Sequence, residues 1–563
     1  MTNLARVTQV AAMTVDDLQS PIRYGHSSLS AALYRWCSLR WLMALWGATI
    51  KRYDNQRPLF TGMLSTYRAI ISVPAMYDVV VPAVYPAVAE ADWQTHNVHA
   101  VDMARRANAS IAIPVYASQI QKEQVSIGRL MPWIELAALH GAGGVGFNSW
   151  KPFDENDELR ASLSQLLDEL NATGAFLATP APTAAFLYIP FGEGFTVQEA
   201  PLYGFATPHG QPIATPPRLS IGEPNKPFAS FQLGTRYGQF DYISLETLSQ
   251  TAVNRYSAIF APVPLYMSSS ITGPNGQPMP ALGIPTAPAL LQRLGVRADP
   301  TWINPAAWLA QYVSAGGVLV TDIGASLAVG GDTFRLLPPD FAQLIGAAGI
   351  RLLIVDPNIA LSMSVLFNHP LFPSLPAGSR IGATTTPFRT VAGVLRFMSA
   401  RAWALMMRAP RRRRRISREA VAMCINAIGR GFVVHAPTLL WANWLPQSPD
   451  FIAFHNDLLK RRAAVNLISA RGLFSPNVHV ALFTDGVASL NVSTQTQLAI
   501  AEVATGAHAR STLMNAHVEF PAGSNSSAVL VRQVIQPLEF AFVGLLPIRV
   551  QCNSRFVAVV NDY

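Results

Sequence analysis

The segment YDVVVPAVYP, from Tyr77 to Pro86, decides the fold class of this chain. Its apolar residues run on without alternation, which is typical of a parallel strand that is buried on both faces. Three similar runs occur in the first 190 residues, at positions 59–61, 111–116 and 144–147. Segments of helical period, such as 96–106 and 130–140, lie between them. Strands and helices that alternate at this spacing predict an α/β fold with parallel pairing.

The composition agrees with a large buried core. The chain has 563 residues and a net charge of +9, but charged residues make up only 13% of it, whereas soluble proteins carry about 25%. A hydrophobic content of 50% excludes disordered, collagenous and coiled-coil proteins. No apolar run approaches the ~20 residues that a membrane-spanning helix needs, and no signal-peptide pattern is visible. We therefore expect no membrane contact and, by default, a cytoplasmic location.

Several kinds of site are not expected. Cys37, Cys424 and Cys552 are odd in number and widely spaced, so they form neither a disulfide framework nor a zinc site. No phosphate-binding loop, HExxH or GxSxG motif occurs, and we expect no metal and no cofactor. The run Arg411–Arg415 is compatible with a nucleic-acid patch, a targeting signal or a kinase site at Ser417. Because no aromatic residues interleave with it, an exposed insertion is the favoured interpretation, and we expect no nucleic-acid partner.

Two further units follow the first. Apolar runs at 183–189, 240–243, 258–262 and 318–321 predict a second α/β unit, with a long Pro- and Gly-rich loop at 201–231. A helix at 305–314, stopped by Gly316 and Gly317, leads into the last of these runs. From residue 477 the pattern alternates, and the turn Thr484-Asp485-Gly486 is a hairpin signal. The tail is therefore expected to be a small antiparallel β domain.

Particular phrases of these units resemble the β-galactosidases of glycoside hydrolase family 42 and their clan A relatives. The phrases are YDVVVPAVYP (77–86), GVGFNSWKPF (144–153), QYVSAGGVLVTD (311–322), GRGFVV (429–434), HNDLL (455–459) and FTDGVASLNVS (483–493). The resemblance implies a partial (β/α)8 TIM-type barrel over residues 1–182, which lacks its first half. It further implies a flavodoxin- or amidotransferase-like α/β domain of the trimerisation type over 183–463, and the antiparallel β domain over 464–563. A homo-oligomer, with a trimer as the first guess, is part of the same expectation.

The resemblance also implies a chemistry. Clan A enzymes are retaining glycosidases, in which an acid/base carboxylate and a nucleophilic carboxylate stand about 5 Å apart. In the family the nucleophile follows barrel strand seven, which corresponds to residues 111–116 here. That strand is followed by Ala117-Ser118-Gln119, and the next carboxylate is Glu123. Glu123 is the candidate catalytic residue if its loop folds back, and a solvated loop glutamate is the alternative. No strand is found where the acid/base residue is expected.

Two aromatic residues are candidates for substrate binding. Trp150 follows the last barrel strand, where the clan has a sugar-stacking tryptophan, and Tyr85 matches a family tyrosine at the end of strand six. Packing at the rim of the barrel explains either residue equally well. The acids that follow Trp150 are interpreted as helix N-terminal residues. The middle domain is interpreted as structural, because no cysteine lies on a strand-to-helix elbow.

Two functions stay open at this point. The first is a glycoside hydrolase-like protein that acts on β-galactosides or related glycans by a retaining mechanism, although its catalytic carboxylates are not found in this chain. The second is a non-catalytic carbohydrate-binding or assembly protein derived from such an enzyme. Both predict a carbohydrate as the partner.

Overall fold

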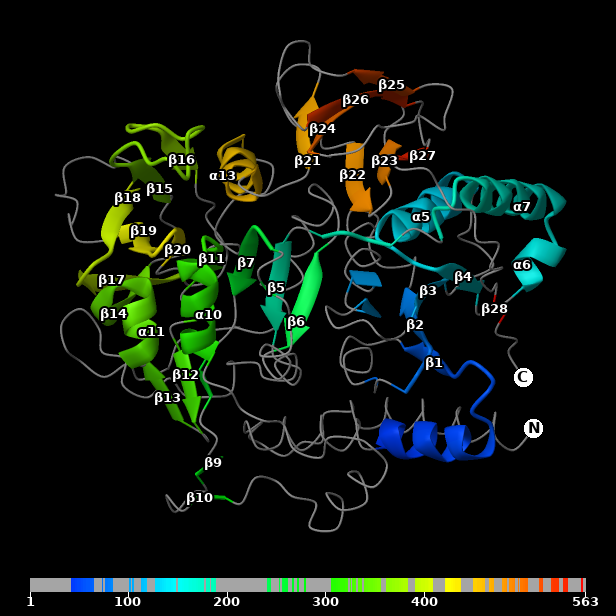
Figure 1. Ribbon diagram of the computed structural model, residues 1–563, viewed down its shortest axis with the longest axis horizontal. Coiled ribbons are helices and arrows are strands. Elements are labelled where there is room, and N and C mark those ends of the chain that lie inside the picture. Colours follow the sequence, from blue (N-terminus) through cyan, green and yellow to red (C-terminus); the bar gives the residue numbers. More distant parts are fainter. Residues whose placement is uncertain are drawn as a thin grey trace.

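The fold is mixed α/β, with two large sheets and several smaller ones in the computed structural model (Figure 1). The structure describes residues 42–64, 73–84, 101–105, 113–118, 127–188, 240–279, 305–408, 421–436, 449–504, 516–519, 528–535, 540–544 and 558–559, with internal gaps in several of these ranges. The predicted loop at 201–231 and the arginine run lie outside the described residues.

The first sheet consists of parallel strands that follow one another in chain order. They are β1 (Phe60–Leu64), β2 (Val79–Val84), β3 (Ile113–Ser118) and β4 (Gly144–Phe147). The predicted parallel pairing is confirmed, and β3 starts and ends two residues later than predicted. On the far side of β4, the short strand β28 (Ala558–Val559) pairs in parallel with it. Consecutive parallel neighbours are the arrangement of strands in a (β/α)8 barrel.

Two helices packed near this sheet follow directly from their sequences. Helix α5 (Ile127–Leu139) leads into β4, and helix α7 (Asp157–Ala172) lies beside α5 (Figure 1). Helix α7 buries one stripe of leucines at helical spacing, namely Leu159, Leu163, Leu166 and Leu170. Asn156 begins the helix, because its side-chain oxygen accepts a hydrogen bond from the Leu159 amide at 3.0 Å.

The second sheet has nine strands and is mixed. Its parallel part, in spatial order, is β20 (Gly431–His435), β11 (Val318–Thr321), β7 (Ala258–Ala261), β5 (Ala184–Tyr188) and β6 (Asp241–Ser244). These strands and helix α10 (Pro305–Ser314) agree with the sequence prediction. Helices α11 (Pro339–Ile345) and α13 (Pro449–Lys460) complete this region, and α13 contains the HNDLL segment.

The antiparallel part of the nine-stranded sheet was not predicted. It comprises β19 (Val421–Ile428), β18 (Arg401–Arg408), β15 (Leu361–Val365) and β16 (Arg380–Gly382). A separate antiparallel pair, β14 (Ala347–Val355) with β17 (Thr390–Phe397), lies in the same part of the chain. Short strands that also escaped prediction are β8 (Tyr266–Met267), β9 (Ile271–Thr272), β10 (Pro278–Met279), β12 (Leu327–Gly330) and β13 (Thr333–Leu336).

The tail forms two antiparallel sheets, as its alternating pattern predicts. The four-stranded sheet contains β21 (Val465–Ser469), β24 (Gln497–Ala504), β26 (Ala528–Ile535) and β25 (Ala516–Glu519). The three-stranded sheet contains β22 (Val478–Phe483), β23 (Gly486–Asn491) and β27 (Phe540–Gly544). The predicted hairpin joins β22 to β23, and Gly486 is the first residue of the second strand. The predicted domain boundaries at 182 and 463 stay predictions.

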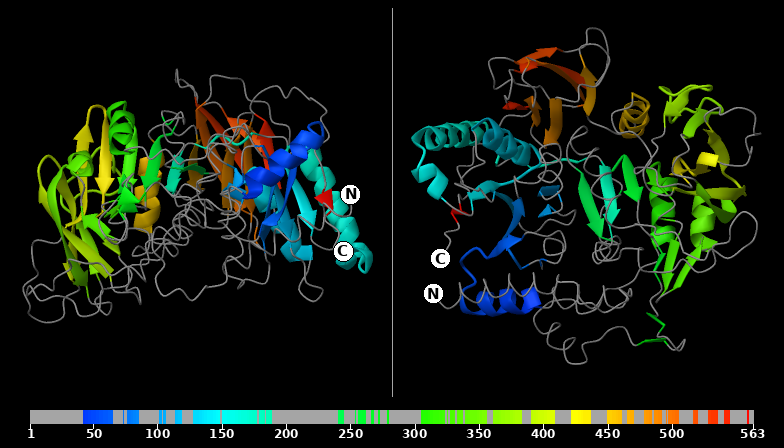
Figure 2. Two further views of the ribbon diagram at one scale, coloured as in Figure 1. Left: turned by 90° about the horizontal axis from the view of Figure 1, so that it is seen from below. Right: turned by 180° about the vertical axis from the view of Figure 1, so that it is seen from behind.

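One apolar core runs through both large sheets. It includes Val80 and Phe147 from the first sheet and Phe186, Phe260 and Val320 from the second. The two sheets lie beside each other, and β5 and β6, at one edge of the second sheet, are its strands nearest to the first sheet, as two further views also show (Figure 2). Within the described residues, no helix has the length and apolar character needed to cross a membrane.

The cap of α7 allows a direct test of this local structure. Asn156→Ala removes the acceptor for the Leu159 amide, so the first turn of α7 should open more easily by about 1 kcal/mol, and its amides should exchange about fivefold faster. Hydrogen exchange measured by mass spectrometry checks this. Asn171→Ala, an exposed change near the other end of the same helix, is the matched control and should leave exchange unchanged. Equal exchange in the two variants would contradict the assigned cap.

Candidate functional site

The carboxyl-terminal edge of the first sheet is the place where a barrel of this kind carries its site. The strands end there at Leu64, Val84, Ser118 and Phe147. Ser118 occupies the centre of this edge, because it is the register partner of Val84 on one side and of Phe147 on the other. None of these described strand ends carries a carboxylate, which agrees with the sequence expectation for residues 117–119.

Trp150 lies at this edge, three residues beyond β4, where it precedes helix α6 (Lys151–Asp154). Its ring centroid lies 4.7 Å from that of Phe153 at an interplanar angle of 30° and 6.2 Å from that of Phe147 at 62°. Phe153 is fully buried, whereas Trp150 is half-buried. The indole is therefore fixed by the core on one part of its surface and exposed on another. Both predicted roles, packing and sugar stacking, are compatible with this placement.

Of the four acids after Trp150, two begin a helix, whereas Asp154 is the last residue of α6 and Glu155 is its C-cap. Asp157 and Glu158 stand in the first turn of α7 and are exposed, and the Arg160 guanidinium contacts Asp157 at 2.6 Å. The negative charges of Asp157 and Glu158 interact favourably with the positive end of the α7 dipole, as predicted. The other two predicted site residues, Glu123 and Tyr85, lie outside the described residues.

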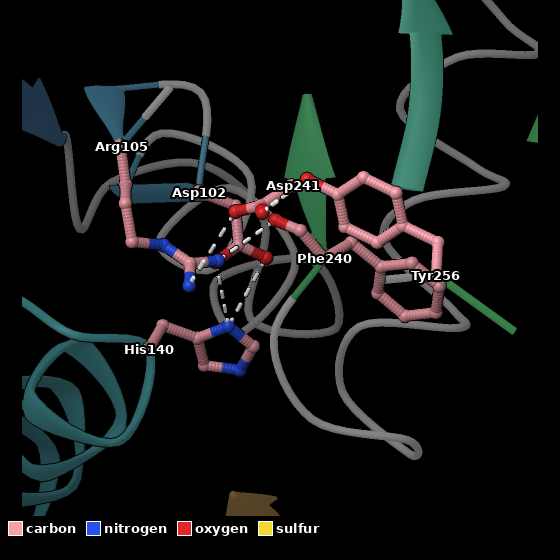
Figure 3. Close-up of polar contacts among 6 residues, drawn as sticks. All are labelled: Asp102, Arg105, His140, Phe240, Asp241 and Tyr256. Carbon is pink, nitrogen blue, oxygen red and sulfur yellow. Dashed lines mark hydrogen bonds and ion pairs between the residues drawn. The ribbon is translucent and has the colours of Figure 1, made fainter. Parts of the chain in front are cut away.

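A second polar cluster lies at the opposite, amino-terminal ends of the strands (Figure 3). Asp102 and Arg105 occupy one helical turn before β3, and His140 follows α5 just before β4. Asp241 is the first residue of β6, and Tyr256 precedes β7. All five side chains are buried, with at most 8% of their surface exposed. Sequence reasoning did not single out any of them, because charged residues at strand starts carry no signal of their distant partners.

Arg105 is the centre of this cluster. Its Nη2 donates to Asp102 Oδ1 at 3.0 Å and to the Phe240 carbonyl oxygen at 2.7 Å. Nδ1 of His140 lies 3.1 Å from both Asp102 carboxylate oxygens, and since a carboxylate only accepts, this nitrogen carries the hydrogen. The Tyr256 hydroxyl donates to Asp241 Oδ2 at 2.6 Å. Because the cluster is enclosed, its chemistry is that of a structural ion network and not of a substrate site.

The carboxyl-terminal edge of the second sheet has a buried polar pair without catalytic character. Oγ1 of Thr321 lies 2.8 Å from Nδ1 of His435, and burial lowers the pKa of His435 to about 3, so the imidazole is neutral. Cys424 lies inside β19 as the register partner of His435, and burial raises the pKa of its thiol to about 12. A thiol with that pKa is not a nucleophile at neutral pH, which supports the structural interpretation of this region. The described residues hold no group of metal ligands.

Comparison with known proteins identifies the fold. The structure resembles the β-galactosidase from Bacillus circulans sp. alkalophilus, with a TM-score of 0.58 and 14% identity over 92% of this chain and 67% of that one. It also resembles a catalytic mutant of a GH42 β-galactosidase from G. stearothermophilus (TM-score 0.55, 13% identity, 88% of this chain and 65% of that one). The β-galactosidase from Rahnella sp. R3 gives a TM-score of 0.56 and 13% identity over 89% and 65% of the two chains.

These likenesses establish a GH42-like fold, and with it a TIM-barrel-like domain. The chain spans about two thirds of the length of these neighbours. A scan against protein-family models and a search of curated proteins found no match.

The buried state of Cys424 predicts its reactivity. In a Cys37→Ser/Cys552→Ser variant, the remaining thiol should not react with Ellman's reagent at pH 8 while the protein is folded, because burial keeps the thiol protonated and inaccessible. One thiol per chain should appear once denaturant is added. Rapid reaction of one thiol in the folded protein would contradict the burial of this strand.

Proposed function

We propose that this chain is a glycoside hydrolase-like protein that binds β-galactosides or related glycans at the carboxyl-terminal edge of β1–β4. The observation that carries the proposal is the position of Trp150 at that edge, in a fold shared with β-galactosidases. We choose β-galactosides as the ligand class because those neighbours are named as β-galactosidases.

The surroundings of Trp150 suit a sugar-binding platform. Contacts with Phe147 and Phe153 hold the indole in place, so that little side-chain entropy is lost when a ligand stacks on its exposed part. The apolar face of a pyranose ring packs well on an aromatic ring. Tyr85, which follows the end of β2 in the sequence, is proposed as a second contact that adds a hydroxyl for hydrogen bonding.

Binding without turnover is the favoured form of this proposal. Retaining hydrolysis needs two carboxylates about 5 Å apart, and none of the described ends of β1–β4 carries one. The alternative, hydrolysis with Glu123 as a catalytic residue, gains some support from β3, which ends at Ser118 instead of Tyr116. Glu123 then follows the strand end by five residues instead of seven, but it still requires a second carboxylate.

Two further predictions accompany this proposal. We propose the division into a partial barrel domain (1–182), an amidotransferase-like domain (183–463) and an antiparallel β domain (464–563). A homotrimer stays the first expectation for the oligomeric state.

Binding is tested by isothermal titration calorimetry with lactose. Trp150→Ala should weaken the affinity about tenfold or more, because the stacking surface is lost, and Trp150→Phe should keep part of it. Trp308→Ala is the matched control, since Trp308 is also half-buried but lies on α10 beside the second sheet. The proposal would be wrong if wild-type protein binds no galactoside at millimolar concentration, or if Trp150→Ala and Trp308→Ala bind equally well.

Turnover is tested separately with 4-nitrophenyl β-galactoside. We expect the wild-type rate to equal that of Glu123→Gln and of the control Glu158→Gln, an exposed carboxylate on α7, because none of the described ends of β1–β4 carries one of the two carboxylates that retaining hydrolysis needs. Hydrolysis that Glu123→Gln abolishes and Glu158→Gln preserves would establish the enzymatic alternative.

A further inference from the structure

The buried network around Arg105 connects the two large sheets. Asp102, Arg105 and His140 come from segments that precede β3 and β4 of the first sheet. Phe240, Asp241 and Tyr256 come from the starts of β6 and β7 in the second sheet. Figure 3 shows the guanidinium of Arg105 facing the carboxylates of Asp102 and Asp241.

In the part of the chain that the structure describes, the Arg105 side chain makes the polar connection between the sheets. Nη2 of Arg105 donates to a carboxylate of its own segment and to the Phe240 carbonyl oxygen, 135 positions away in the chain. Nη1 of the same group lies 3.9 Å from Asp241 Oδ1. The guanidinium is a rigid planar fork, so these contacts fix directions as well as distances.

The apolar contact between the sheets does not provide such directions. Both sheets contribute to one apolar core, and hydrophobic burial is non-directional, so several relative orientations would bury a similar area. Phe186 and Phe260, whose ring centroids lie 5.2 Å apart, belong to this apolar part of the contact on the side of the second sheet.

The network contributes little to stability for its size. Charges taken out of water carry a large desolvation cost, which the attraction between them roughly offsets. Among the described residues, Nε and Nη1 of Arg105 and Nε2 of His140 have no hydrogen-bond partner, so the contact of Nη1 with Asp241 is an ion pair only. The advantage of this network over apolar residues is geometric, because each hydrogen bond tolerates only a narrow range of positions.

We propose that Asp102, Arg105, His140, Asp241 and Tyr256 form a latch that sets the orientation of the first sheet relative to the second. Arg105 is the residue whose contacts reach both sheets. His140 holds Asp102 on the side of the first sheet, and Tyr256 holds Asp241 on the side of the second. This inference concerns the relative placement of the sheets and does not depend on sugar binding.

Distances between two spin labels test the latch directly. The labels are placed at Tyr53→Cys and Met398→Cys in a Cys37→Ser/Cys552→Ser background. Both positions are well exposed, at 86% and 58%. Tyr53 ends the helix at 42–53, whose Lys51 contacts Asp78 just before β2, and Met398 directly follows β17. Cys424 is buried and stays unlabelled. Double electron–electron resonance then reports the distribution of relative orientations.

Arg105→Met should broaden the distance distribution or add a second distance, and Tyr256→Phe, which removes one hydroxyl, should broaden it less. Arg160→Met is the matched control, because Arg160 and Asp157 form an arginine–aspartate pair of the same three-residue spacing that is exposed. It should leave the distribution unchanged.

The outcomes distinguish a network that sets the relative orientation of the sheets from one that only stabilises the residues around it. A broadened distribution in Arg105→Met or Tyr256→Phe, with native circular dichroism, supports the latch. If Arg105→Met does not fold, Tyr256→Phe decides alone. A wild-type distribution in every folded variant, even where thermal stability falls, would overturn the proposal.

Discussion

The whole structure depends on one constraint, which is that parallel strands must be covered on both faces. Strands such as β7 and β11 are buried along their full length. This requirement explains why half of the residues are hydrophobic and only 13% are charged, without any need for a membrane. It also leaves the two ends of each strand as the places where polar chemistry can occur.

The carboxyl and amino ends of the strands carry different kinds of residues in this protein. The carboxyl ends of β1–β4 carry Ser118 and are followed by the half-buried Trp150. The amino ends carry the enclosed network around Arg105, which no ligand can reach. The same separation is general in (β/α)8 proteins, where the carboxyl face carries function and the amino face carries stability. Here the amino face also connects the first sheet to the second.

Sequence reasoning recovered the parts of the fold that local pattern determines. The runs at 144–147 and 318–321 and the helix at 305–314 were located to the residue, because continuous apolar runs and a Gly stop are local signals. The antiparallel strands β18 and β19 were missed, since RAWALMMR and VAMCINAI mix helix-forming and strand-forming residues. Of the candidate site, Trp150 was predicted from its place after the run at 144–147 and its role stays a prediction, whereas the Arg105 network depends on contacts 135 positions apart that no local pattern reveals.

The central claim is that a galactoside binds at the carboxyl-terminal edge of β1–β4 against Trp150. A crystal structure of the protein grown with lactose tests it most directly, because it shows the ligand and its contacts together. The account predicts a galactosyl ring stacked on the exposed part of the Trp150 indole, beyond the ends of β3 and β4. A sugar bound elsewhere, or an empty edge at saturating lactose, would contradict it.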